Sequence, residues 1–84
     1  MSNGNHMVPT SKGFGINSSA ILTIMSPDSA ASRRLIADAR QAGKLVDMCA
    51  GKRAKSLILL NTGHVVTVAV HGITMRRRFA ATKE

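Results

Sequence analysis

Short apolar runs alternate with polar breaks along this chain. The segment from Ile16 to Met25 ends in the run Ala20–Met25, whose two isoleucines favour a buried strand. His64–Val70 is valine-rich and compact, and it is the clearest strand in the sequence. We expect His64 to begin that strand with its ring satisfied by a neighbouring group.

A helical pattern lies between these strands, over about residues 29–43. The breaks at Ser26–Ser29 and Gly43 suit the start and the end of a helix. At 100° per residue, one side carries small and apolar positions, namely Ala31, Ser32, Leu35, Ile36, Ala39 and Ala42. Arg33, Arg40 and Lys44 fall on the opposite side. This basic arc is typical of a solvated face on a helix that covers a sheet, and it also suits contact with phosphates or with another subunit.

Two further apolar runs, Leu45–Cys49 and Leu57–Leu60, are separated by a polar break that contains Gly51. Strand-length runs separated in this way predict a β-hairpin. Its exposed tip would carry the cations Lys52, Arg53 and Lys55, because an unpaired charge is costly to bury. A solvated turn that aids solubility is the alternative. A second turn is predicted at Asn61–Gly63.

The chain ends in a predicted short helix from Ile73 to Ala81, after a break at Gly72. Met75, Phe79 and Ala80 would form its apolar side. The same predicted helix contains the densest charge run of the chain, which is Arg76, Arg77 and Arg78. Three successive helical residues point in three directions, so these arginines cannot all contact one phosphate.

The order of elements predicts an α+β fold: a small, mostly antiparallel sheet with one main helix and a short C-terminal helix. Residues 1–12 lack periodicity, and we expect a disordered tail there. Part of that tail is compatible with a vector-derived remnant before a natural start at Met7. Residues 13–84 would form a single domain.

Charge narrows the function classes. Twelve Lys and Arg against four Asp and Glu give a formal charge of +8, which favours a polyanionic partner. The two aromatic residues, Phe14 and Phe79, offer little to stack against bases, so duplex DNA is favoured over single strands. The single cysteine excludes an intrachain disulfide and suits a cytoplasmic protein. We therefore expect a small core to be supplemented by oligomerisation.

Other classes find little support in the residues. No apolar run approaches the roughly 18–20 residues of a membrane span. We expect no metal, because the ligand spacing of a structural zinc site is missing. We also expect no cofactor and no small-molecule substrate. No carboxylate pair or nucleophile arrangement points to an enzyme. Asp47 stands in an apolar context and would need a hydrogen bond or a basic partner from another subunit.

Several segments together resemble the RemA family, small bacterial regulators of extracellular-matrix (biofilm) genes. The resemblance extends from Gly13 to Val70 and rests on Ser26–Ala30, Arg33–Ile36, Asp38–Arg40, Gly43, Leu45–Asp47, Gly51–Arg53 and His64–Val66. It implies a DNA-binding transcriptional regulator of α+β fold that assembles into a ring-like homo-oligomer. The family's DNA-contacting basic pair maps onto Lys52 and Arg53. Ala20 falls near a family arginine that contacts DNA, and Ala50 replaces a usual aromatic residue.

We accordingly predict a cytoplasmic ring of identical subunits that binds duplex DNA. The candidate contacts are Lys52, Arg53, Lys55, Arg33, Arg40, Arg76, Arg77 and Arg78. Two other functions stay open. An RNA-binding ring would use the same charge, and an adaptor oligomer would present its basic faces to acidic proteins.

Overall fold

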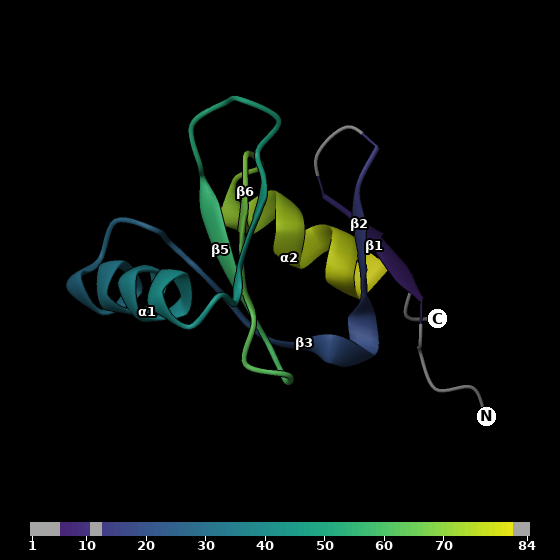
Figure 1. Ribbon diagram of the computed structural model, residues 1–84. Helices are drawn as coiled ribbons and strands as arrows, with labels where there is room; N and C mark the ends of the chain where they lie inside the picture. Colours follow the sequence, from purple (N-terminus) through teal and green to yellow (C-terminus); the bar gives the residue numbers. More distant parts are fainter. Residues whose placement is uncertain (1–5, 11–12, 82–84) are drawn as a thin grey trace.

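The structure, a computed structural model, describes residues 6–10 and 13–81 (Figure 1). In chain order these residues form β1 (Met7–Pro9), β2 (Gly15–Asn17), a 3-10 turn (Ser18–Ala20), β3 (Ile21–Met25), α1 (Ala30–Gln41), β4 (Leu45–Met48), β5 (Ser56–Leu60), β6 (Val65–Val68) and α2 (Gly72–Ala81). The fold is a small α+β domain with mostly antiparallel strand pairs, as the sequence predicts.

The main sheet has the strand order β3-β5-β6-β4. β5 pairs antiparallel with β3 and with β6, so the turn at Asn61–Gly63 does form a hairpin. β4 pairs with β6 instead, and that pair is parallel. The predicted hairpin between β4 and β5 is therefore wrong, because β6 lies between them. All four residues of β6 are buried, which suits a central strand, whereas β4 is only partly buried and suits the edge.

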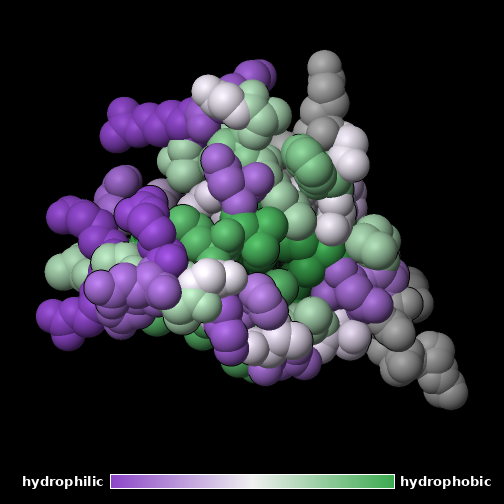
Figure 2. All heavy atoms as spheres, viewed as in Figure 1, coloured by the Kyte–Doolittle hydropathy of each residue, from purple (hydrophilic) through white to green (hydrophobic). Residues whose placement is uncertain are grey.

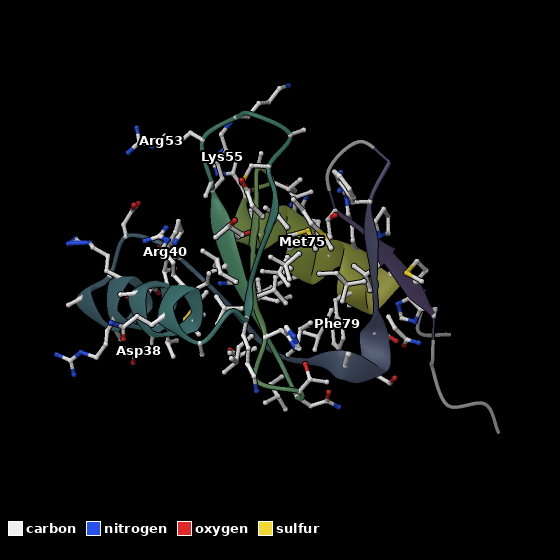
Figure 3. The ribbon with its side chains drawn as sticks, in the orientation of Figure 1. Asp38, Arg40, Arg53, Lys55, Met75 and Phe79 are labelled. Atoms are coloured by element: carbon white, nitrogen blue, oxygen red, sulfur yellow. The ribbon has the colours of Figure 1, made fainter. Side chains whose placement is uncertain are left out.

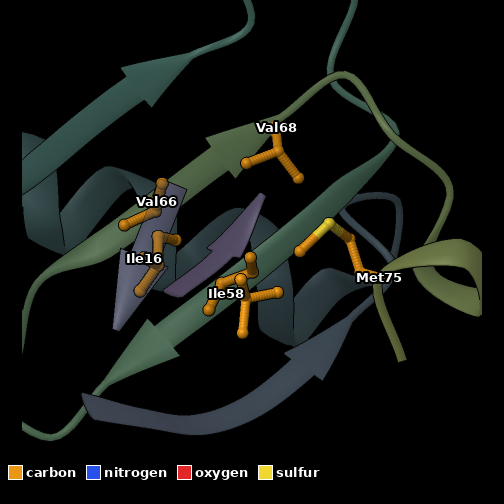
Figure 4. Close-up of a cluster of buried hydrophobic side chains, with 6 residues drawn as sticks. Ile16, Ile58, Val66, Val68 and Met75 are labelled. Carbon is orange, nitrogen blue, oxygen red and sulfur yellow. The ribbon is translucent and has the colours of Figure 1, made fainter. Parts of the chain in front are cut away.

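Helices cover both faces of this sheet (Figure 1). On one face α1 packs against Leu57 and Val65 through the buried Ala39 and the half-buried Leu35 and Ile36. On the other face α2 and the β1–β2 pair enclose a second cluster, shown in Figure 4, that contains Val8, Ile16, Ile58, Val66, Val68 and Met75. The alternation of side chains along β5 and β6 supplies both clusters from the same strands.

The boundaries of α1 follow its predicted start and stop signals. The Ser29 side chain accepts a hydrogen bond from the Ser32 backbone N–H, as an N-cap does. Gly43, just past the helix end, has φ +72°, a conformation that glycine adopts without strain. Ala31 and Ala42 were expected on the apolar side, but both are exposed, so the buried stripe is narrower than the pattern predicted.

The structure of the N-terminal segment contradicts the prediction of a disordered tail over residues 1–12. Met7–Pro9 forms β1, which pairs antiparallel with β2, and Val8 is fully buried in the core. A disordered tail is therefore wrong for this segment; residues 1–5 and 11–12 lie outside the described residues. Pro9 fits because this two-stranded sheet leaves its outer backbone free of strand partners. A guanidinium of α2 also holds the segment, since Arg78 Nη1 donates to the carbonyls of Pro9 (3.2 Å) and Thr10 (2.8 Å).

Candidate nucleic-acid interface

Three connecting segments meet at one end of the main sheet. β3, β4 and β6 run in the same direction, and β5 runs in the opposite direction. The chain therefore leaves β3, β4 and β6 at the same sheet end where it enters β5. The segment after β3 leads to α1, the segment after β4 leads to β5, and the segment after β6 leads to α2. Figure 1 shows the second of these rising above the sheet.

We call residues 49–55, between β4 and β5, the basic loop. It begins with a tight turn, in which the Lys52 N–H donates to the Cys49 carbonyl over 3.0 Å. The two central residues, Ala50 and Gly51, have φ values of +54° and +83°. Positive φ at both positions is characteristic of a type I′ turn. Gly51 supplies that conformation without strain, so the local sequence sets the direction in which Lys52 and Arg53 leave the turn.

Both ends of the basic loop are attached to β6. At its start, Asp47 Oδ1 accepts hydrogen bonds from the Cys49 N–H (3.0 Å) and from Thr67 Oγ1 (3.1 Å). The bond from the Cys49 backbone is the main cause that holds the pKa of Asp47 below its usual value. At the loop's end, the Lys55 N–H donates to the Val68 carbonyl over 2.8 Å. Asp47 thus has an internal structural role, which answers the question its apolar context raised.

The three cations of the basic loop all lie in solvent. Lys52, Arg53 and Lys55 are exposed, and Figure 3 shows Arg53 directed away from the body of the molecule. Within residues 6–10 and 13–81, their side chains make no hydrogen bond or ion pair. Figure 2 shows polar surface at the top of the molecule, where this loop lies, and at the left around α1, next to a central apolar area. The loop therefore presents unneutralised positive charge on an ordered backbone.

The same sheet end contains an open pocket of about 540 Å³ between the three segments. Arg53 and Lys55 line it from the basic loop, and Arg76 lines it from the first turns of α2. Ala54 of the basic loop also lines it, and the remaining wall comes from the segments after β3 and β6 and from the start of α2, through Ser26, Asp28, His71, Gly72 and Ile73.

 Arg76 follows Arg53 by 23 positions in the sequence, so the fold alone brings these two side chains to one pocket.

The other predicted contacts are distributed more widely. Arg33 lies beside this sheet end, because its Nη2 donates to the Asp28 carbonyl over 2.7 Å. Arg40 is in the last turn of α1, about 10 Å further along the helix axis at the usual rise per residue. Arg77 is exposed on α2, next to Arg76 but outside the pocket lining. Arg78 is half-buried, and its guanidinium holds β1 as described above, which gives it a structural role.

Sequence reasoning did not select Ser26, Asp28 or His71 as site residues. Each stands in a segment that is ordinary by composition, and each reaches the pocket only because β3 and β6 are parallel. The sequence did show that these residues lie in the segments that follow strands. It did not show that those segments meet at one sheet end, because that depends on the order and direction of the strands. His64, by contrast, fits its prediction, since its Nδ1 lies 2.7 Å from Thr62 Oγ1.

In the part of the chain that the structure describes, no three His, Cys, Asp or Glu side chains come together in a way that could hold a metal ion. Neither described helix is long and apolar enough to cross a membrane.

The fold and the sheet end define a small α+β protein with an ordered, strongly basic loop region. Comparison with known proteins gives the family: the sequence model of the RemA-like family, described as extracellular matrix regulatory protein A-like, matches residues 7–79. The chain belongs to this family. The match begins at Met7, where β1 begins.

Relatives from several organisms support the same assignment. A protein of Gloeothece citriformis is 38% identical over 74 residues, which is 86% of this chain and 84% of the relative. A protein of Nitratidesulfovibrio vulgaris is 36% identical over 81 residues, which is 96% of this chain and 94% of the relative. A protein of Geobacillus kaustophilus is 41% identical over 68 residues, which is 79% of this chain and 78% of the relative. All three are named as candidate regulatory proteins, so the family and its relatives indicate a regulatory protein rather than an enzyme.

Proposed function

We propose that this protein is a transcriptional regulator that binds duplex DNA through the basic loop and acts as a ring-like homo-oligomer. Genes of the extracellular matrix are the targets that the family's description suggests. The observation that carries the proposal is the basic loop itself: Lys52, Arg53 and Lys55 are exposed on a backbone attached to β6 at both ends. Positive side chains held in this way suit contact with backbone phosphates.

The charge of the whole chain supports a polyanionic partner. A formal charge of +8 on 84 residues would favour encounter with DNA before any specific contact forms. The scarcity of aromatic side chains argues against a surface that stacks unpaired bases. Duplex DNA fits both features, because its phosphates need only well-placed Lys and Arg.

Oligomerisation would convert weak contacts into useful affinity. One subunit offers only a few phosphate contacts, whereas a ring repeats the basic loop at regular intervals and links the contacts. Two features support a self-association surface. β3 and β4 are the outer strands of the main sheet and have one unpaired edge each. On β3, the Leu22 side chain is 64% exposed, so this outer strand presents an apolar side chain to a neighbouring subunit.

The direct test is fluorescence anisotropy of labelled duplex DNA across a salt series. Lys52→Ala should weaken binding and make the dependence of log K on log salt shallower, by about one unit for each lost phosphate contact. Lys44→Ala is the matched control, because Lys44 is also exposed but precedes β4, at the opposite end of the sheet. Equal effects of the two substitutions would contradict a phosphate contact by the basic loop.

Two further measurements address the assembly and the type of nucleic acid. Native mass spectrometry of the protein alone should give a multiple of the 8.9 kDa chain, and a monomer at working concentration would contradict the ring. Competition between duplex DNA and duplex RNA of the same sequence separates the two nucleic acids. Preference for RNA would replace the proposed target, and failure to bind either at physiological salt would favour an acidic protein partner.

A further inference from the structure

The pocket at the sheet end combines two kinds of chemistry. On one side Arg53, Lys55 and Arg76 present positive charge. On the other side Ser26 and Asp28 present oxygen atoms. A carboxylate repels phosphate, so a site for the DNA backbone alone gives Asp28 no favourable contact. The combination instead matches a ligand that has phosphates at one end and hydrogen-bond donors at the other.

The beginning of α2 adds to the positive side. Gly72 and Ile73, the first two residues of this ten-residue helix, line the pocket. The Met75 N–H donates to the His71 carbonyl, which is the first hydrogen bond of the helix. The N–H groups of residues 72–74 precede that bond and have no partner inside the helix. Such groups favour an anion, and here they accompany three cationic side chains in one cavity.

The negative side is held in a fixed shape. The Ser26 hydroxyl accepts a hydrogen bond from the Asp28 N–H over 3.2 Å, and the Ser26 carbonyl accepts one from the buried Ser32. The Asp28 carbonyl is bound by Arg33. These bonds use backbone atoms of Asp28, so its exposed carboxylate is left to accept hydrogen bonds from a ligand. Hydroxyl groups of a ribose are suitable donors, and the DNA backbone has none of them.

Size distinguishes a nucleotide from a single phosphate. The pocket volume of about 540 Å³ lies within the range of roughly 300–1,000 Å³ that is usual for small-molecule sites. Inorganic phosphate would leave most of this space to water. Ile73 lines the pocket with 59% of its surface exposed, and it offers an apolar contact for a base or a sugar.

We propose that this pocket binds a free ribonucleotide, with its phosphates on Arg53, Lys55, Arg76 and the start of α2, and with its sugar hydroxyls on Asp28. A second consequence, which rests on the proposed DNA binding, is competition. Arg53 and Lys55 belong both to the pocket and to the basic loop, so a bound nucleotide would occupy cations that DNA needs. The nucleotide would thereby lower the affinity of the protein for DNA.

The binding test is isothermal titration calorimetry of the full chain with ATP, with GTP and with inorganic phosphate. At least one nucleotide should bind about tenfold or more tightly than phosphate, because it makes additional contacts on the Asp28 side. Arg76→Gln should weaken nucleotide binding by about tenfold. Arg77→Gln removes the same charge from the neighbouring, exposed position outside the pocket and should change the affinity by less than about twofold.

Asp28→Ala gives the sharpest distinction, because its two effects have opposite signs. Removal of the carboxylate should weaken nucleotide binding and should strengthen the binding of inorganic phosphate. The backbone bonds of residue 28 persist in this variant, and a thermal melt would confirm that it folds. Stronger binding of both ligands would identify a simple phosphate site and overturn the nucleotide assignment. Equal losses in Arg76→Gln and Arg77→Gln would overturn the pocket, since they would indicate attraction by charge alone.

Competition is measured separately, by adding the tighter nucleotide to the complex of the protein with labelled duplex DNA. Release of DNA at nucleotide concentrations near its calorimetric Kd supports shared use of Arg53 and Lys55. Nucleotide binding without release would overturn the competition. Nucleotide binding by a protein that never binds DNA would refute the proposed function and leave the pocket assignment standing.

Discussion

A substitution of Arg78 tests whether this arginine of α2 stabilises the fold, as its hydrogen bonds indicate, or is available to contact DNA. Its guanidinium donates to two backbone carbonyls of the β1 segment, at 2.8 and 3.2 Å, and the shorter bond is partly buried. A hydrogen bond that involves a charged group contributes about 1.5–3 kcal/mol when buried. Because one bond is exposed and the other is only partly buried, we expect Arg78→Met to lower the free energy of unfolding by about 1–2 kcal/mol.

The assay is urea denaturation followed by circular dichroism, at one fixed protein concentration because assembly affects apparent stability. A chain of this size has an m-value of about 1 kcal/mol per molar urea, so the midpoint should fall by about 1–2 M. Arg77→Met is the control, since Arg77 is exposed and makes no such bond. It should leave the midpoint unchanged within about 0.5 M.

Hydrogen exchange locates the effect within the molecule. The Thr10 N–H donates to the Phe14 carbonyl and the Ser18 N–H donates to the His6 carbonyl, and these bonds flank the β1–β2 pair. Their amides should lose protection in Arg78→Met more than the amides of β5 and β6 do, because Arg78 holds β1 and not the main sheet. Equal stability of the two variants, or uniform loss of protection, would refute the structural role.

Two other predictions concern the core and the acid dependence of stability. Met75 is fully buried, so Met75→Ala should lower the free energy of unfolding by about 2–5 kcal/mol and the melting temperature by about 10 °C or more. Ile73 is 59% exposed, so Ile73→Ala should shift the melting temperature little. Similar shifts in the two variants would contradict the packing. The pKa of Asp47 is lowered in the folded protein, so its contribution to stability is present above the unfolded pKa of about 3.9 and is lost as pH falls through the folded pKa. Urea denaturation should therefore show Asp47→Asn to be less stable than the native chain at pH 6, with a smaller difference at pH 3; a constant difference would contradict this linkage.

The sequence predicted local structure well, because local signals determined it. The Ser29 cap, the Gly43 stop and the Asn61–Gly63 turn each rest on a few adjacent residues, and each is present in the structure. The exposure of Lys52 and Arg53 also followed from residue type, since an unpaired charge is costly to bury.

Strand pairing was not predictable in the same way. Two apolar runs with a glycine between them satisfy the hairpin pattern whether or not they pair, and the pattern does not show that β6 will lie between β4 and β5. The pocket depends on this order, so its Asp28 and His71 walls could not be found from spacing. The N-terminal segment misled in the opposite direction: residues 1–12 lack periodicity, but a strand as short as Met7–Pro9 shows no period, and its proline is compatible with an outer edge that has no partner.

The attachment of both ends of the basic loop to β6 affects the entropy of binding. A flexible basic segment loses backbone freedom when it meets its ligand, and that loss subtracts from the affinity. Here the hydrogen bonds of Asp47 and of the Lys55 N–H fix the loop ends when the protein folds. Binding then has to order mainly the side chains of Lys52, Arg53 and Lys55, at about 0.5–1.5 kcal/mol each. Folding has therefore already met most of the conformational cost of recognition at this sheet end.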